Sequence, residues 1–219
     1  MPDLQLLRSV ALFADLTDDE LAALAQTVES RKFVRNDMLF AEGSEPTELF
    51  VVVAGRVAIS SKSIDGRESM FALMERGDLF GEMGLFDEHG RSADARALEP
   101  SQAMVVPYAP LRTMYERRPS LLWGVVRLLA GRLRSTDVAL SDAVFLDVTG
   151  RTAKRLLELA GDTDEFTLPI TQEELAGMVG ASRERVNKAI ASFVRLGWLD
   201  QADRQYRFLK RDELERRAR

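Results

Sequence analysis

A short loop between residues 81 and 92 collects side chains that could bind a sugar phosphate. Its sequence, Gly-Glu-Met-Gly-Leu-Phe-Asp-Glu-His-Gly-Arg-Ser, combines an acid (Glu82), an arginine (Arg91) and a hydroxyl (Ser92) with glycine corners such as Gly81. A carboxylate accepts hydrogen bonds from ribose hydroxyls, and a guanidinium binds a phosphate through two parallel hydrogen bonds. Glycine lets backbone N–H groups approach an anion closely. The loop therefore predicts a site that holds a ribose and a phosphate together.

A second group of residues, between positions 171 and 190, has the spacing of two short helices joined at a glycine. Thr171 and Glu174 lie three residues apart, as in a capping box, and Ser182 can cap the second helix. Gly180 supplies the left-handed corner between the two helices. This pattern indicates a helix-turn-helix. The residues expected to face its core are Leu175, Ala176, Val179, Val186, Ile190 and Phe193.

The outward face of the second helix carries side chains suited to reading base edges. Arg183 and Glu184 lie in its first turn, the part that enters the major groove in this motif. Arginine pairs with guanine and glutamate accepts from cytosine, while the helix starts at Thr171 and Ser182 favour phosphate. A solvated surface is the usual interpretation of a charged helix face, but the helix-turn-helix spacing favours DNA. The predicted outward face is Arg183, Glu184, Asn187 and Lys188.

The elements that must position the first loop are short strands. From residue 32 to about 106, β-branched and aromatic runs are separated by glycine turns, with Asp65-Gly66 as a strong hairpin turn and further corners at Gly43, Gly55 and Gly77. Many short strands with frequent turns predict a β-barrel or jelly roll. Before them, Thr17 is placed to cap a helix over 18–28. The runs predicted as strands are 33–34, 38–40, 49–53, 57–60, 69–74 and 104–106.

A long helix is predicted to begin at Pro119 and to run to about Leu146, roughly 42 Å at ~1.5 Å per residue. Its heptad spacing favours a parallel dimer seam, interrupted by the polar Thr136, where a ligand could reach the partner chain. A single buried helix without a partner is the alternative. The seam residues are Leu122, Val126, Leu129, Leu133, Thr136, Leu140 and Ala143. A second apolar set that could face the strands is Val125, Leu128 and Val144.

The remaining segments complete a winged helix. Residues 147–150 have the composition of a hinge, and a helix is predicted over 151–160. A β-hairpin, the wing, is predicted from residues 198–199 and 206–208 around a turn, 202–204, that lacks glycine.

Composition limits the chemistry that this chain can perform. Its 219 residues suffice for one large or two modest domains. The absence of cysteine excludes disulfides, iron–sulfur clusters and thiolate zinc sites, and the single histidine, His89, is expected to be an exposed loop residue instead of a metal or haem ligand. The longest uncharged stretch, Pro100 to Leu111, is too short to span a bilayer. We therefore expect no metal and no membrane partner.

The charge is distributed unevenly along the chain. The net charge of −5 divides into +2 for residues 149–219 and −7 for residues 1–148. Residues 183–195 alone contain four basic side chains and one acid. This asymmetry indicates that the C-terminal part meets a polyanion, and chance is the alternative explanation.

The chain resembles the CRP/FNR family of bacterial transcription regulators, and actinobacterial cyclic-AMP receptors in particular. The resemblance covers nearly the whole chain and follows the family's order of elements. It is carried by Phe80-Gly-Glu-Met-Gly-Leu-Phe, Arg91-Ser92-Ala93, Phe145-Leu-Asp-Val-Thr-Gly-Arg151, Thr171-Gln-Glu-Glu-Leu and Gly180-Ala-Ser-Arg-Glu-Arg-Val-Asn-Lys188. It implies an α+β protein with three parts: a cyclic-nucleotide-binding β-roll (1–117), a dimerisation helix (118–146) and a winged helix-turn-helix (147–219).

The resemblance also implies roles for single residues. Glu82 would bind the ribose 2′-hydroxyl beside Gly81, Arg91 and Ser92 would bind the cyclic phosphate, and Thr136 would contact the adenine N6. Position 137 of the other subunit usually completes that contact with Ser or Asn, and Asp137 departs from this pattern because it brings two like charges near a two-fold axis. The implied DNA-binding residues are Thr171, Ser182, Arg183, Glu184 and Lys188.

We therefore expect a homodimeric, cytoplasmic regulator that binds cyclic AMP and then double-stranded DNA, with RNA polymerase as a further partner. An orphan regulator of the same fold is one alternative, in which Glu82 and Arg91 form a salt bridge without ligand, although that bridge offers no reason for Thr136 in the seam. A nucleoid protein is another. A cyclic-nucleotide-controlled enzyme subunit is disfavoured because no nucleophile–base pair and no room for a catalytic domain follow the strands.

Overall fold

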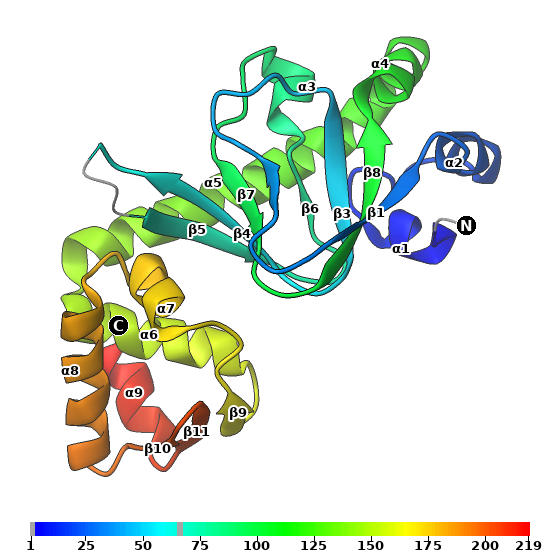
Figure 1. The fold of residues 1–219 in the computed structure, drawn as a ribbon. Coiled ribbons are helices and arrows are strands. Elements are labelled where there is room, and N and C mark those ends of the chain that lie inside the picture. Colours follow the sequence, from blue (N-terminus) through cyan, green and yellow to red (C-terminus); the bar gives the residue numbers. More distant parts are fainter. Residues whose placement is uncertain (1–2, 65–67) are drawn as a thin grey trace. The chain divides into compact units, whose positions relative to one another are not determined.

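The computed structural model describes residues 3–64 and 68–219 (Figure 1). The chain divides into two compact units, the first made of residues 1–67 and 71–134 and the second of residues 68–70 and 135–219. The predicted hairpin turn at Asp65-Gly66 lies outside the described residues. The three domains predicted with boundaries near 117 and 146 stay a prediction.

Short antiparallel strands build the first unit, as the glycine-punctuated runs predict. Among the described residues, two four-stranded sheets have the orders β1-β8-β3-β6 and β2-β7-β4-β5. Gly43, Gly55 and Gly77 adopt φ angles of 78°, 78° and 94°, so the three predicted corners are confirmed. The strands are β1 (Glu29–Phe33), β2 (Met38–Phe40), β3 (Glu48–Ala54), β4 (Val57–Lys62), β5 (Glu68–Met74), β6 (Leu79–Phe80), β7 (Asp94–Ala97) and β8 (Ser101–Pro107).

Every strand predicted between residues 32 and 106 overlaps an observed one, but β6 and β7 of this unit were not predicted. β6 contains two residues, too few for a period to be read, and it exists because Phe50 and Val51 of β3 pair with it. β7 reads Asp-Ala-Arg-Ala, without a β-branched or aromatic residue, and forms because it lies between β2 and β4. Pairing across the sheet therefore decides these two strands.

The apolar run in β3 is buried on both of its faces. Leu49 and Val51 belong to a core shared with the surrounding helices, whereas Phe50 and Val52 belong to a second core inside the roll. Successive side chains of a strand point to opposite faces, so a continuous apolar run fits a strand covered on both sides. The helices of this unit are α1 (Leu4–Ser9), α2 (Asp18–Ala25), α3 (Met83–Asp87), α4 (Tyr108–Arg117) and a 3₁₀ turn over Pro119–Leu121.

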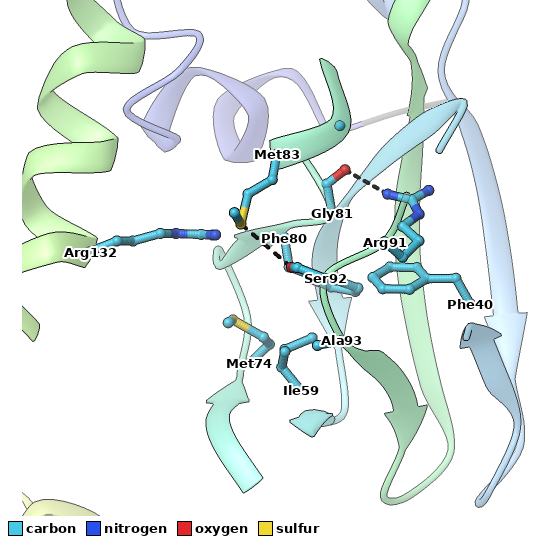
Figure 2. Close-up of a pocket in the computed structure, with 11 residues that line it drawn as sticks. Phe40, Ile59, Met74, Phe80, Gly81, Met83, Arg91, Ser92, Ala93 and Arg132 are labelled. Atoms are coloured by element: carbon cyan, nitrogen blue, oxygen red, sulfur yellow. Dashed lines mark hydrogen bonds between the residues drawn. The ribbon is translucent and has the colours of Figure 1, made fainter. Parts of the chain in front are cut away.

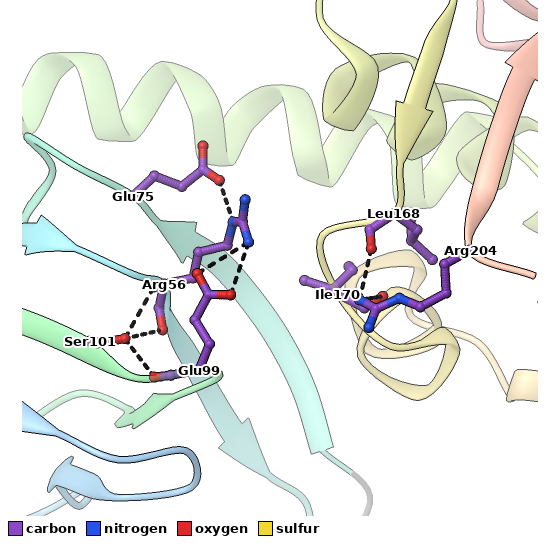
Figure 3. Close-up of polar contacts among 7 residues, drawn as sticks. All are labelled: Arg56, Glu75, Glu99, Ser101, Leu168, Ile170 and Arg204. Atoms are coloured by element: carbon purple, nitrogen blue, oxygen red, sulfur yellow. Dashed lines mark hydrogen bonds and ion pairs between the residues drawn. The ribbon is translucent and has the colours of Figure 1, made fainter.

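Arg56 joins the ends of several strands in this unit (Figure 3). It follows Gly55 in the turn between β3 and β4, and its guanidinium pairs with Glu75 at 2.7 Å and with Glu99 at 3.2 Å. The hydroxyl of Ser101 accepts from the Arg56 N–H at 3.1 Å and donates to the Glu99 carbonyl at 2.8 Å. These partly exposed pairs hold the turn at one end of the roll.

The long helix α5 spans Leu122–Phe145, close to the predicted end at Leu146. The predicted start at Pro119 opens a 3₁₀ turn, and α5 begins three residues later. Val125 is buried and Leu128 packs on the same core, which confirms two members of the second apolar set. Val144 is 66% exposed, so its expected burial was wrong. The apolar side chains of the predicted seam that are exposed on this chain are Leu122, Val126, Leu129, Leu133 and Leu140.

The second unit contains the predicted winged helix. The helix predicted over 151–160 begins three residues earlier, at Val148, because Asp147 accepts a hydrogen bond from the Gly150 N–H and caps it. The hinge predicted at 147–150 stays a prediction. Asp203 adopts φ 53° and provides the left-handed corner of the wing without a glycine. The elements are α6 (Val148–Ala160), β9 (Glu165–Thr167), α7 (Gln172–Val179), α8 (Arg183–Arg195), β10 (Leu199–Ala202), β11 (Gln205–Phe208) and α9 (Arg211–Arg217).

The helix-turn-helix core matches the sequence prediction closely. Thr171 and Glu174 form the capping box, Gly180 has φ 67°, and Ser182 accepts from the Arg185 N–H. The six residues expected to face inward are all buried: Leu175, Ala176, Val179, Val186, Ile190 and Phe193. Across residues 3–64 and 68–219, no helix is both long enough and apolar enough to cross a membrane.

Candidate functional site

A pocket of about 60 Å³ opens inside the roll, beside the loop that the sequence singles out (Figure 2). Gly81, Arg91 and Ser92 line it together with apolar side chains from the strands and with Arg132 of α5. The structure therefore brings the predicted phosphate-binding residues to one place. The complete lining is Phe40, Ile59, Met74, Phe80, Gly81, Met83, Gly84, Arg91, Ser92, Ala93 and Arg132.

Arg91 is turned toward the protein and satisfies backbone carbonyls. Only 7% of the residue is exposed, and its guanidinium donates to the Gly81 carbonyl at 2.6 Å and to the Glu48 carbonyl at 2.7 Å. The group also lies 4.1 Å from the ring centre of Phe40, a cation–π distance. Burial lowers the pKa of Arg91. Its Nε is buried and has no hydrogen-bond partner among the described residues.

Glu82 is completely buried and pairs with an arginine that sequence analysis did not select. Arg132 donates to Oε1 of Glu82 at 2.5 Å and to the Leu79 carbonyl at 2.6 Å. The second oxygen, Oε2, is buried and finds no partner in the described part of the chain. Burial raises the pKa of Glu82, and the charge of Arg132 works against that rise. The Glu82–Arg91 bridge considered as an alternative is thus replaced by a Glu82–Arg132 ion pair.

Position 81 requires glycine for two reasons. Its φ of 76° lies in the left-handed region, and a Cβ added there would lie 2.7 Å from Nη1 of Arg91. The hydroxyl of Tyr108 donates to the Gly81 carbonyl as well, so this carbonyl anchors two side chains. Ser92 is exposed and its hydroxyl lies 3.5 Å from the Met83 sulfur (Figure 2). The loop is therefore held in place before any ligand arrives.

The pocket is small for a ligand site. Ligand sites for small molecules are typically about 300 Å³ or more, above the 60 Å³ observed here. Arg132 lines the pocket from α5, with its side chain 35% exposed and its guanidinium on Glu82. One signal was present in the sequence, since Arg132 stands four residues before Thr136 on the same helix.

The other two predicted ligand residues lie in the second unit. Thr136 and Asp137 are exposed on the C-terminal half of α5, whereas the lining of the pocket comes entirely from the first unit. Their proposed contact with a base stays a prediction.

The predicted reading face of α8 is open to solvent. Arg183, Glu184 and Lys188 are exposed, and Glu184 pairs with Lys188 at 2.7 Å across one helical turn. This lysine lowers the pKa of Glu184, so the carboxylate stays ionised. Asn187 is partly exposed and its Oδ1 is buried, so it is the least exposed of the four residues predicted for the outward face.

The hydroxyls of Thr171 and Ser182 accept hydrogen bonds at two helix starts. Thr171 accepts from the Glu174 N–H at 3.2 Å and Ser182 from the Arg185 N–H at 3.4 Å. Each hydroxyl keeps its own proton, which it can donate to a phosphate. Arg204 of the wing turn donates to the carbonyls of Leu168 and Ile170, directly before Thr171 (Figure 3).

No part of the described chain forms a metal site. A search of these residues finds no group of three or more His, Asp or Glu that could hold an ion. His89 is exposed, and its Nδ1 lies 2.6 Å from the Asp87 carbonyl, so the loop position predicted for it is confirmed.

Comparisons with known proteins agree with this architecture. Residues 30–118 match the cyclic nucleotide-binding domain and residues 150–217 the Crp-like helix-turn-helix domain. A CRP-like cAMP-activated global transcriptional regulator of Mycobacterium tuberculosis is 36% identical, covering 98% of this chain and 99% of that protein. The cAMP-activated global transcriptional regulator Vfr of Pseudomonas aeruginosa is 34% identical over 76% of this chain and 83% of its own.

A solved structure shows the same fold. FixK2 from Bradyrhizobium japonicum superposes with a TM-score of 0.78 at 20% identity, over 86% of this chain and 96% of that one. The chain belongs to the CRP/FNR family of transcription regulators, which confirms the resemblance seen in its motifs. It is a DNA-binding regulator with a cyclic-nucleotide-binding domain, from a family of regulators and not of enzymes.

Proposed function

We propose that this chain is a cyclic-AMP-responsive transcription regulator that binds a two-fold symmetric operator as a homodimer. The observation that supports it most is that Glu82 and Arg91, both buried, lie beside one pocket of a cyclic-nucleotide-binding domain. Each has one polar atom without a partner among the described residues. The relatives that cover the chain at 34–36% identity are named as cAMP-activated regulators. The protein acts without catalysis, in the cytoplasm, where its DNA lies.

The ligand would be held by charge and by hydrogen bonds, with one protein group that accepts and others that donate. Glu82 accepts from the ribose 2′-hydroxyl through Oε2, which lacks a partner among the described residues. Arg91 and Ser92 donate to the cyclic phosphate, and Gly81 supplies close backbone approach. This donor and acceptor set fits a cyclic nucleotide.

The seam on α5 would join two copies of the chain. Its leucines and Val126 are 40–64% exposed on the isolated chain, more apolar surface than a lone helix would leave in water. In such a parallel pair, Thr136 contacts the adenine N6 and Asp137 of the partner accepts from the same amino group. The seam thereby links ligand binding to the arrangement of the two DNA-binding heads.

Each reading helix would enter one of two successive major grooves about 34 Å apart. Arg183, Glu184 and Lys188 contact base edges, and the resemblance implies half-sites like TGTGA, with lysine at 188 relaxing one base. Thr171 and Ser182 contact phosphates. RNA polymerase is the expected partner of the DNA-bound dimer.

Binding of cyclic AMP would shift a population between two arrangements of the dimer. A ligand moves such an equilibrium only by its different affinity for the two states. In this proposal, the contacts that the nucleotide makes with the roll and with Thr136 and Asp137 at the seam provide that difference. The nucleotide then favours the arrangement in which the two heads match the operator.

Calorimetry and operator binding test the proposal together. Cyclic AMP should bind with one site per chain, whereas 5′-AMP, which lacks the cyclic ester, should bind much more weakly. Saturating cyclic AMP should raise operator affinity by about 5- to 150-fold, the range of common allosteric couplings. An unchanged DNA affinity at saturating ligand refutes the switch.

Two alternatives give different results in the same assays. An orphan regulator keeps its regulation when Arg91 is replaced by alanine, whereas a cyclic-AMP receptor loses its response. A nucleoid protein binds random duplexes as well as any operator, so competition with random DNA identifies it.

A further inference from the structure

Arg151 bridges the ends of two helices in the second unit. It lies in the first turn of α6, and its Nε donates to the Val179 carbonyl at 2.8 Å. Its Nη1 donates to the Leu146 carbonyl at 2.7 Å. Val179 is the last residue of α7, and Leu146 directly follows the last residue of α5. One guanidinium therefore joins the end of the seam helix to the turn of the helix-turn-helix.

These two carbonyls belong to a class of groups that need an outside partner. The last carbonyls of a helix have no donor within that helix and carry partial negative charge. A guanidinium donates along several fixed directions in one plane, so it can hold two carbonyls at a set separation. A lysine, with one compact charge on a flexible stem, cannot fix two such directions at once.

A second contact ties α6 to α5 one turn further along. Lys154 pairs with Asp142 of α5 at 2.7 Å, and the two side chains are only 25% and 13% exposed. Asp147 caps α6 and pairs with Arg217 of α9. Residues 135–145 of α5 accordingly belong to the same compact unit as the winged helix.

We propose that Arg151 is the positioning residue that couples the seam helix to the DNA-reading turn at Gly180. The inference rests on the proposed function and names the contact that links the seam helix to the DNA-binding head. Within the second unit, Arg151 fixes the end of α5 to the turn between α7 and α8. Arg151 touches neither nucleotide nor DNA and acts only by fixing the turn to the helix.

The experiment compares full-length wild type with R151Q, R151K and the control R155Q. Arg155 stands one turn later on α6 and pairs with Glu158 of the same helix, so its loss breaks no contact between elements that is seen here. Operator affinity is measured by fluorescence anisotropy with and without saturating cyclic AMP, on a symmetric duplex selected by the wild-type protein. Calorimetry gives the cyclic AMP affinity of each variant without DNA.

The expected result separates coupling from binding. R151Q and R151K should bind cyclic AMP within about threefold of wild type, while the effect of cyclic AMP on operator affinity falls below about threefold from the roughly 5- to 150-fold of a coupled protein. R155Q should keep the wild-type effect. Hydrogen exchange should become faster in R151Q at residues 142–147 and 176–182 together, and should stay unchanged there in R155Q.

The inference is overturned if R151K and R151Q keep the full cyclic AMP effect, or if R155Q loses as much of it. R151K keeps the charge and is the decisive variant should R151Q fail to fold. If cyclic AMP does not change the DNA affinity of the wild-type protein, the proposed function is refuted, and the coupling role of Arg151 is refuted as well. The two failures are therefore distinguished by the wild-type measurement alone.

Discussion

The pocket of the roll and the reading face of α8 handle charge in opposite ways. In the roll, Glu82 is fully buried and Arg91 is 7% exposed, and both are held by internal partners. On α8, the side chains of Glu184 and Lys188 are 76% and 74% exposed. The first region keeps its charged groups on internal partners, whereas the second exposes them to solvent.

This contrast has an energetic basis. A buried charge depends on its partner, because removing the partner leaves a desolvated charge uncompensated. An exposed pair depends little on its partner, since water replaces it at small cost. Substitutions in the roll should therefore alter the stability of the protein, and substitutions on α8 should alter DNA binding alone.

The largest effect is expected from Arg132→Met, which leaves Glu82 buried without its cation. We expect the first unit to lose about 2–4 kcal/mol of unfolding free energy, somewhat below a fully buried pair because Arg132 is partly exposed. Urea unfolding followed by intrinsic fluorescence measures this loss. Arg134→Met, at an exposed position of the same helix, should be near neutral, and adding Glu82→Gln to Arg132→Met should recover much of the loss. If Arg132→Met and Arg134→Met lost equal unfolding free energy, the contrast between buried and exposed charges would be contradicted.

The same variant should respond to pH in a defined direction. Burial holds the pKa of Glu82 above its ordinary value of 4.5, so between the two values the folded state binds more protons than the unfolded state. Stability contributed by this group is therefore present at low pH and falls as pH rises through the raised pKa. Removing Arg132 raises the pKa further, so the defect of Arg132→Met should be smaller at pH 5 than at pH 8. Unfolding at the two pH values checks this, and a defect that grows on acidification contradicts it.

An intermediate effect, on DNA binding and not on stability, is expected from Glu184→Gln. Loss of a base contact costs about 1–3 kcal/mol of operator affinity, whereas loss of the exposed pair with Lys188 should change unfolding by less than about 0.5 kcal/mol. Anisotropy on operator variants should also show weaker preference at one base pair. Asp212→Asn, which breaks an exposed pair with Arg216 one turn away on α9, is the matched control and should change neither quantity.

The smallest effect is expected from Arg204→Gln. Because Arg204 donates to the Leu168 and Ile170 carbonyls, its loss should loosen the start of α7 and weaken operator binding by about 1 kcal/mol. The dependence of operator affinity on salt should stay the same, because Arg204 donates to carbonyls of the protein and not to a phosphate. If the variant's slope of log affinity against log salt concentration were smaller in magnitude by about 0.9, Arg204 would instead contact a phosphate.

Local patterns could be predicted where a few neighbouring residues decide the conformation. The capping box of Thr171 and Glu174, the corner at Gly180 and the cap at Ser182 each depend on partners within three residues. The buried face of the helix-turn-helix followed from helical spacing in the same way. The strands β6 and β7 could not be predicted, because neighbouring strands decide them.

The amino-acid sequence by itself determined the family, the two kinds of site and the residues around Gly81 that bear the charge, because residue types and short spacings specify these. Only the tertiary structure decided where those charges point. Glu82 meets Arg132 fifty residues away, and Arg91 meets the Glu48 carbonyl forty-three residues away. Such contacts depend on how the sheets pack and on the cost of burying an unpaired charge, and no local pattern records either.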